Sequence, residues 1–196
     1  GSFGASIDMQ TNYVSPKPYS EGELSYGSFN TVVASMGAGS GLTPSGFSFD
    51  ARYSYNTTDG YIRNGKGKLN SFFATMGYLA KRSSFKVIYI YGDQHTGITW
   101  EGASREMLES DRRGNIAGMY YDEGGNVRYY DNETDNYTQH FVQGFFSHRF
   151  DNGLYWNNTL NFTKGDGYYE NYKDDAKFSK YGLQPQNSIS KSDLII

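Results

Sequence analysis

Aromatic and arginine side chains are concentrated in one stretch of the chain, Asp93–Asn136. A guanidinium beside an aromatic ring can hold an anionic, aromatic ligand by charge attraction, stacking and cation–π contact. The same rings can stack on the faces of sugars. A further interpretation assigns them to loop packing or to an aromatic belt at a membrane boundary. The candidate ligand-binding residues are Trp100, Arg105, Arg112, Arg113, Tyr120, Tyr121, Arg128, Tyr129 and Tyr130.

A second stretch, Gly165–Lys191, combines tyrosines with lysines, and the same interpretations apply to it. Binding residues concentrate in loops that a rigid scaffold positions, which favours ligand contact for some of them. The candidates here are Tyr168, Tyr169, Tyr172 and Lys173. Ser104–Arg113, within the first stretch, is expected to form one or two helical turns, to which its few apolar residues assign no function.

The acidic run Asp131–Asp135 places carboxylates at alternate positions, as calcium-binding loops do. Asn136 stands where such a loop needs its glycine, and Val142 stands where it needs its last glutamate, so a solvated loop is the better interpretation. The three histidines, at positions 95, 140 and 148, lack the spacing of a metal site. We therefore predict no metal site and no cofactor.

The residue patterns of common catalytic centres are missing from the sequence. There is no cysteine, which excludes disulfides, thiolate zinc sites and cysteine nucleophiles. A hydrolase nucleophile elbow, a phosphate loop and a zinc-protease helix are also missing. The net charge is −3 and no basic run occurs. We predict that the protein is not an enzyme and does not bind nucleic acid.

Alternation of apolar and polar residues is the main structural signal, and it predicts an all-β fold. The composition agrees, because 24 glycines, 19 tyrosines and 13 phenylalanines accompany only 37% hydrophobic residues. In Gly46–Tyr55 the aromatic residues share one face, which lipid would meet in a barrel and which a soluble sandwich would bury. The expected strands are Glu21–Ser28, Thr31–Ala38, Gly46–Tyr55, Ser71–Ala80, Ser84–Tyr91, Tyr137–Phe150 and Leu154–Thr163.

The connections between these strands alternate between short and long. Gly41–Ser45, Lys81–Ser84 and Asp151–Gly153 are short, and the last contains the hairpin signal Asn-Gly. The long connections are Thr57–Leu69, Asp93–Asn136 and Gly165–Lys191. Transmembrane barrels show this asymmetry, with short periplasmic turns and long extracellular loops.

We expect about seven strands and the start of an eighth. So few strands, joined by such long loops, are not expected to close into a barrel by themselves. An open sheet edge in lipid would leave backbone groups without hydrogen-bond partners. We therefore expect the chain to be a fragment of a larger antiparallel transmembrane β-barrel.

Several short motifs resemble TonB-dependent outer-membrane receptors, particularly those of the Bacteroidetes type. The opening GSFGASIDMQT resembles the end of the plug domain in this family, and SYGSFNT (Ser25–Thr31) resembles the first barrel hairpin. Asp59-Gly60-Tyr61, TDNYTQH (Thr134–His140) and GDGYYENYK (Gly165–Lys173) are also similar to that subgroup. The resemblance implies that residues 1–17 end a plug domain and that residues 18–196 begin a 22-stranded barrel.

The same resemblance implies a location in the bacterial outer membrane and active uptake of a scarce, bulky solute. Energy would come from the TonB complex, which engages residues outside this chain, and the partners would be outer-membrane lipid and a small-molecule or iron-complex ligand. A ferric siderophore or another iron complex is the first expectation. The alternatives are an oligosaccharide or cobalamin importer of this family, or a soluble all-β binding or adhesion module.

Overall fold

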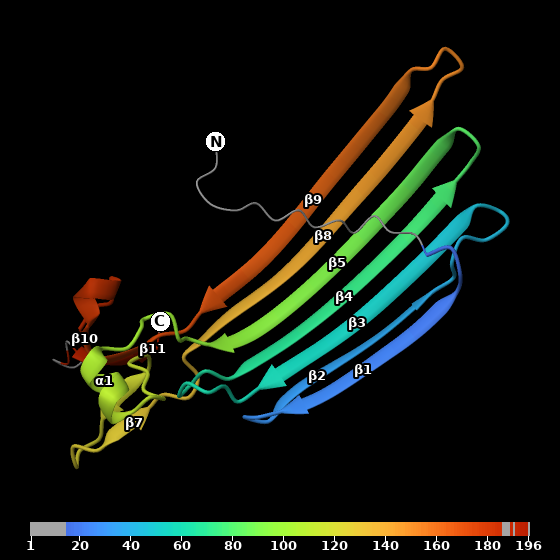
Figure 1. Cartoon of the computed structure of the whole chain (residues 1–196). Helices are drawn as coiled ribbons and strands as arrows, with labels where there is room; N and C mark the ends of the chain where they lie inside the picture. The colour runs from blue at the N-terminus through green and yellow to red at the C-terminus, as the bar shows by residue number, and fades with distance from the viewer. Residues whose placement is uncertain (1–14, 186–188, 190, 196) are drawn as a thin grey trace.

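The computed structural model describes residues 15–185, 189 and 191–195 and shows an all-β, antiparallel chain. The expected plug segment, residues 1–17, lies almost entirely outside the described residues. Seven consecutive strands pair in one sheet in the order β1-β2-β3-β4-β5-β8-β9 (Figure 1). Their bounds are Tyr19–Gly27, Thr31–Gly39, Phe47–Thr58, Gly67–Leu79, Ser83–Gly97, Thr134–Arg149 and Tyr155–Tyr169.

Short elements fill the remaining segments. The helix α1 spans Arg105–Ser110, at the position where the sequence predicts a helical turn. The strands β6 (Met119–Tyr121) and β7 (Val127–Tyr129) form one small hairpin. The strand β10 (Tyr172–Lys177) pairs with β11 (Lys191–Ile195), and the short 3-10 helix η1 (Phe178–Tyr181) lies between them in the chain. None of the helices in the described part of the chain is long and apolar enough to cross a membrane.

The predicted strands are confirmed, but β3, β4, β5, β8 and β9 each extend at least three residues further than predicted. β3 and β4 pair out to Thr58 and Gly67, which shortens the expected connection Thr57–Leu69 to residues 59–66. β5 continues to Gly97 and β8 starts at Thr134, so Asp93–Asn136 shrinks to residues 98–133. Backbone hydrogen bonds extend these ladders through polar residues, where the alternation of apolar side chains has already ended.

Two other predictions about the end of the chain are wrong. Gly165–Lys191 is not one connection, because β9 continues to Tyr169 and β10 follows it. The strand at the end of the chain, β11, pairs with β10 instead of joining the large sheet as its eighth strand.

Register gathers the aromatic side chains of β3 on one face of the sheet and its polar side chains on the other, where Phe73 and Ile88 of the next two strands also lie. Phe47 lies opposite Tyr78, Phe49 opposite Met76, and Tyr53 opposite Phe72. Directly opposed residues of an antiparallel pair share a face, so one face, here called the aromatic face, collects these rings. Ser48, Asp50, Arg52 and Thr75 occupy the other, here called the polar face.

Glycines on β2 let side chains from two non-adjacent strands meet across the polar face. Arg52 of β3 forms an ion pair with Glu21 of β1, above Gly37. The ring of Tyr19 and the carboxylate of Asp50 converge above Gly39, where a Cβ would lie 2.4 Å from the ring and 2.3 Å from the carboxylate oxygen. A side chain at Gly39 would push these groups apart, which explains the glycine at that position, whereas a Cβ at Gly37 would lie 3.4 Å from Glu21, an ordinary contact.

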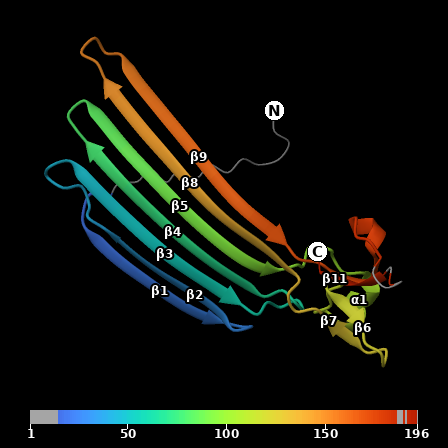
Figure 2. The ribbon, with the colours of Figure 1, turned by 180° about the vertical axis from the view of Figure 1, so that it is seen from behind.

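The two ends of the sheet differ, as the lengths of the connections predict. The turns between β2 and β3, β4 and β5, and β8 and β9 lie together at one end, and α1, β6, β7, β10 and β11 lie together at the other (Figures 1 and 2). At the Asn-Gly turn, Gly153 has φ +85° and its N–H donates to the Phe150 carbonyl at 3.1 Å. We call residues 59–66, 98–133 and 170–185 the loop assembly.

Substitution of Gly97 with alanine should destabilise the junction between β5 and the loop assembly. A Cβ at Gly97 would lie 1.6 Å from the Asn64 carbonyl oxygen, and the Gly97 N–H donates to the Lys66 carbonyl at 2.7 Å. We expect the free energy of unfolding to fall by about 1–3 kcal/mol, as in other overpacked sites. Thermal unfolding followed by circular dichroism measures the change.

Gly92→Ala is the matched control on the same strand, because nothing lies within 4 Å of its added Cβ. That variant should unfold within about 0.5 kcal/mol of the parent. Equal effects of the two substitutions would contradict the close approach of Asn64.

Candidate functional site

Asn115 holds two parts of the loop assembly together from a buried position. Its Nδ2 donates to the backbone carbonyls of Arg63 at 2.9 Å and Ile98 at 2.8 Å. Its Oδ1 accepts the Ala117 N–H at 3.1 Å. Ile98, Asn115 and Ala117 are all buried. One amide side chain therefore satisfies three backbone groups that the folded loops remove from water. The sequence analysis missed it, because an Asn between two loop residues carries no periodic signal.

Glu133 attaches the third part of the loop assembly. This buried carboxylate accepts a hydrogen bond from the Asn171 amide at 2.7 Å and another from the Tyr172 N–H at 3.5 Å. Glu133 therefore holds residues 98–133 and the segment that follows β9 in contact. Among the described residues, no group of three histidine or carboxylate side chains is placed to hold a metal ion.

Three of the predicted ligand-binding tyrosines form one cluster. Tyr172 lies 5.1 Å from Tyr120 and 5.5 Å from Tyr130, centroid to centroid. The predicted residues Trp100 and Tyr169 form a separate edge-to-face pair at 6.3 Å. Each cluster joins residues 98–133 to the segment around the end of β9, so these rings contribute to loop packing, as the more conservative interpretation proposed.

Several of the predicted cationic residues are engaged within the loop assembly. Arg113 Nε donates to the Tyr61 carbonyl at 2.8 Å, and its guanidinium lies 5.6 Å from the centre of the Phe29 ring. Arg128 Nε donates to Asp122 at 2.9 Å, beside the β6–β7 turn. Lys173 lies opposite Leu194 in the β10–β11 ladder. Tyr121 and Tyr129 lie on β6 and β7, where Tyr129 faces Arg63 at 6.0 Å.

The contact with Arg113 also explains a strained turn. Phe29 and Asn30 join β1 to β2 with φ of 60° and 52°, a conformation that a bulky side chain rarely adopts. The Phe29 ring packs edge-to-face on Tyr61 at 5.5 Å and against Arg113. These contacts offset the strain and attach the first hairpin to the loop assembly.

Arg105 and Arg112 are brought together at an open cleft. Tyr61, Leu108 and Glu109 complete its lining, and its volume is about 680 Å³. We call it the arginine cleft. Ser104 caps α1 by accepting the Met107 N–H at 3.1 Å, which positions Arg105 at the first turn. Arg105 Nε donates to Glu109 at 3.1 Å, but the Arg105 side chain is still largely exposed. Two guanidiniums, a phenol ring and a leucine make a surface suited to an anionic ligand with apolar parts.

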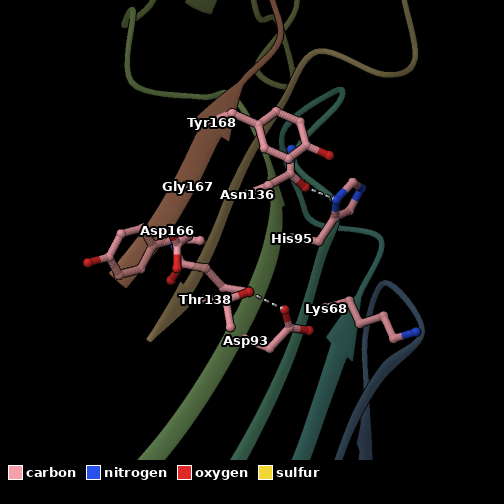
Figure 3. Close-up of a pocket in the computed structure, with 10 residues that line it drawn as sticks. Lys68, Asp93, His95, Asn136, Thr138, Asp166, Gly167 and Tyr168 are labelled. Atoms are coloured by element: carbon pink, nitrogen blue, oxygen red, sulfur yellow. Dashed lines mark hydrogen bonds between the residues drawn. The ribbon is translucent and has the colours of Figure 1, made fainter. Parts of the chain in front are cut away.

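A second cavity, of about 700 Å³, lies on the sheet itself at the end nearest the loop assembly. We call it the sheet cavity (Figure 3). Thr138 Oγ1 donates to Asp93 at 3.0 Å, and Asn136 Oδ1 is hydrogen-bonded to His95 Nδ1. Tyr168 is the predicted ligand-binding residue that falls here. The lining residues are Lys68, Asp93, Gln94, His95, Asn136, Tyr137, Thr138, Asp166, Gly167 and Tyr168.

Three carboxyls of the loop assembly, those of Glu106, Asp111 and Asp122, have a pKa below the ordinary value, and Asp111 is the one held by another segment of the assembly. Arg63 Nε donates to Asp111 Oδ2 at 2.9 Å, and this bond lowers the pKa of the Asp111 carboxyl below its ordinary value. The Arg113 N–H, 3.0 Å from Oδ1, lowers it further. Because the ionised form is favoured in the fold, the contribution to stability is present above the ordinary pKa and is lost as the pH falls through the lowered one.

The Asp111 carboxyl should titrate below the ordinary aspartate pKa of about 3.9. Arg63→Gln should return the pKa toward that value, because it removes the largest cause of the shift. Arg128→Gln is the control, since Arg128 pairs with Asp122 instead. Carboxyl-carbon NMR titration measures the midpoint, and a midpoint that Arg63→Gln leaves unchanged would contradict the assignment.

Comparison with protein-family models, with curated proteins and with solved structures finds no match to this chain. The arrangement of its own side chains therefore carries the functional argument.

Proposed function

We propose that this chain forms part of the transmembrane β-barrel of a bacterial outer-membrane receptor. The observation that supports it is the exposure of the aromatic face. Phe47, Phe49 and Met76 are 52%, 53% and 49% exposed, whereas Ser48, Asp50 and Thr75, on the polar face, are only 4–8% exposed. A soluble sheet buries its apolar face. Lipid on the aromatic face and water on the other satisfy both faces.

The apolar band has the height that a membrane requires. On β3 it runs from Phe47 to Tyr55, nine residues, or about 27 Å along the strand at about 3.3 Å per residue. A tilted transmembrane strand needs about 9–11 residues. Tyr55, the last residue of this band, lies opposite Asn70, and in that row the aromatic face becomes polar on the next four strands. The residues of the row are Asn70, Asp93, Thr138 and Asp166.

The exposed edges of the sheet support the barrel. In the described part of the chain, β1 and β9 each pair on one side only, and both are exposed along their full length. Lipid cannot satisfy the unpaired backbone groups of an edge strand, so further strands must close the sheet. The resemblance to TonB-dependent receptors supplies the finer proposal: a 22-stranded barrel, a plug facing the polar face, and energy from the TonB complex.

The arginine cleft is the surface we propose for ligand capture, with a ferric siderophore or another iron complex as the ligand. Arg105 and Arg112 would attract its negative charge, and Tyr61 and Leu108 would contact its apolar parts. The exposed aromatic face argues against the soluble binding or adhesion module, which would bury it. We propose no catalytic role for these residues.

The two tryptophans report separately on the membrane and on the loops. Trp156 lies on the aromatic face and Trp100 in the loop assembly, and their exposures are similar, 55% and 62%. In the intact receptor, any tryptophans outside this chain are first replaced by phenylalanine. In vesicles with brominated acyl chains, the fluorescence of that receptor carrying Trp100→Phe should then be quenched through Trp156. With Trp156→Phe, the remaining Trp100 signal should be quenched far less. Equal quenching of the two would contradict the proposed orientation.

Replacing both arginines of the cleft should weaken ligand binding. For Arg105→Ala/Arg112→Ala in the intact receptor, we expect an affinity loss of at least about tenfold, or about 1.4 kcal/mol, for an anionic ferric siderophore. Titration with ferric siderophores, haem, cobalamin and oligosaccharides identifies the ligand class. Arg128→Ala removes an arginine outside the cleft and should bind normally. Unchanged binding by the double variant would exclude the cleft as the site.

A further inference from the structure

The sheet cavity lies on the aromatic face, at the level where that face changes from apolar to polar. Its side chains come from four neighbouring strands, with Lys68 on β4, Asp93 and His95 on β5, Asn136 on β8, and Tyr168 on β9 (Figure 3). Register places these five residues on the face that carries Phe72 and Tyr91, whereas Gln94, Tyr137 and Gly167 of the lining alternate with them along the strands. The cavity therefore opens outward, directly beyond the apolar band and away from the arginine cleft.

The chemistry of the cavity suits a hydroxyl-rich group. Asp93 accepts hydrogen bonds from Thr138 and from Asn70, at 3.0 and 3.3 Å, and a carboxylate can accept more than two. Asp166 is exposed and lies 3.6 Å from Lys164. Carboxylates accept from hydroxyl donors, while the Lys68 ammonium donates to hydroxyl and ring oxygens. Asp93 and Asp166 balance the charges of Lys68 and Lys164, so the cavity has no excess positive charge to favour a polyanion.

Tyr168 and Asn136 would determine how a ligand is oriented in the sheet cavity. The Tyr168 ring is 64% exposed and borders the cavity, so one of its faces is available for stacking on the C–H face of a sugar. Two hydrogen bonds fix the Asn136 amide: its Oδ1 is bonded to His95 Nδ1, and its Nδ2 donates to Thr134 Oγ1 at 3.0 Å. Such fixed polar groups orient a ligand without being ordered by it.

The apolar surface beyond the cavity can take the rest of an amphiphile. On β8, the aromatic face continues past His140, which lies opposite Lys164, to Val142 and Gly144, which lie opposite Phe162 and Leu160 of β9. Nothing lies within 4 Å of the point where a Cβ of Gly144 would be, so this part of the band lacks a side chain. An acyl chain that runs along the band from the cavity would fill this space.

We propose that the sheet cavity binds the sugar headgroup of an outer-leaflet glycolipid whose acyl chains lie along the apolar band. This inference rests on the proposed membrane orientation of the aromatic face. The lipid would bind at the sheet cavity, whereas the captured solute would bind at the arginine cleft. Asp93, Asp166 and Lys68 bind the hydroxyls, and Tyr168 packs on a sugar ring.

The test is lipid retention by the intact receptor. Nanodiscs contain phosphatidylcholine with a minor fraction of a diglucosyl diacylglycerol, and the lipids that remain after mild detergent extraction are quantified by mass spectrometry. We expect the glycolipid to be enriched about threefold or more over its fraction in the disc, which corresponds to a modest difference in affinity. Parallel discs with diacylglycerol or with phosphatidylglycerol in its place should show no enrichment.

Asp166→Ala/Tyr168→Ala should abolish the enrichment. Both side chains are exposed, so the fold tolerates their loss. Tyr121→Ala, at a tyrosine of nearly equal exposure in the loop assembly, should retain it. Enrichment that survives the double variant, equal enrichment of phosphatidylglycerol, or full competition by free maltose would each overturn the proposal, the last by showing a site for soluble sugar.

Trp156 quenching in the same discs separates the two hypotheses. If Trp156 is not quenched by brominated chains, the membrane orientation fails and this inference fails with it. If Trp156 is quenched and the glycolipid is not enriched, the orientation stands and only the lipid site is overturned.

Discussion

The antiparallel backbone ladder through seven consecutive strands is the constraint on which the rest of the structure depends. Directly opposed residues of two paired strands share a face. The register of β3 against β4 therefore places Phe47, Tyr78 and Phe49 together on one face, and Asp50 and Thr75 together on the other face. A shift of one residue would send the rings to the polar face, where Arg52 and Glu21 meet above Gly37. The ladder thus determines both the lipid-facing band and the polar interior surface of the proposed barrel.

The loop assembly depends on the ladder in a different way. The ladder delivers three chain segments to one end of the sheet, but it does not pack them. Buried polar groups do so: Asn115 holds residues 59–66 to residues 98–133, and Glu133 holds the latter to the segment after β9. Each of these groups would be costly to bury alone, so each segment of the loop assembly depends on the next one for hydrogen-bond partners.

Alternation in the sequence was sufficient to predict the strands, their faces and the asymmetry of the two sheet ends. It was not sufficient beyond the apolar band, because the pairing of Thr57 with Lys68 or of His95 with Asn136 depends on backbone hydrogen bonds, which any residue can make. The β10–β11 pair and the roles of Asn115 and Glu133 depend on contacts between distant segments. The prediction of a helical turn succeeded because its cap, Ser104, is local.

Contacts between distant segments also explain why some of the predicted site residues pack against other loop residues while others line the two cavities. Five of the thirteen predicted aromatic and basic residues contact one another, because loops without a large apolar core must use such contacts to fold. Tyr120 and Tyr130 contact Tyr172, and Trp100 contacts Tyr169. The arginine cleft is lined wholly by the loop assembly, so any rearrangement of the loops changes its shape. The sheet cavity is lined by paired strands, whose geometry the ladder holds constant. A ligand that moves the loops can therefore alter the cleft without disturbing the surface that we propose to meet the membrane.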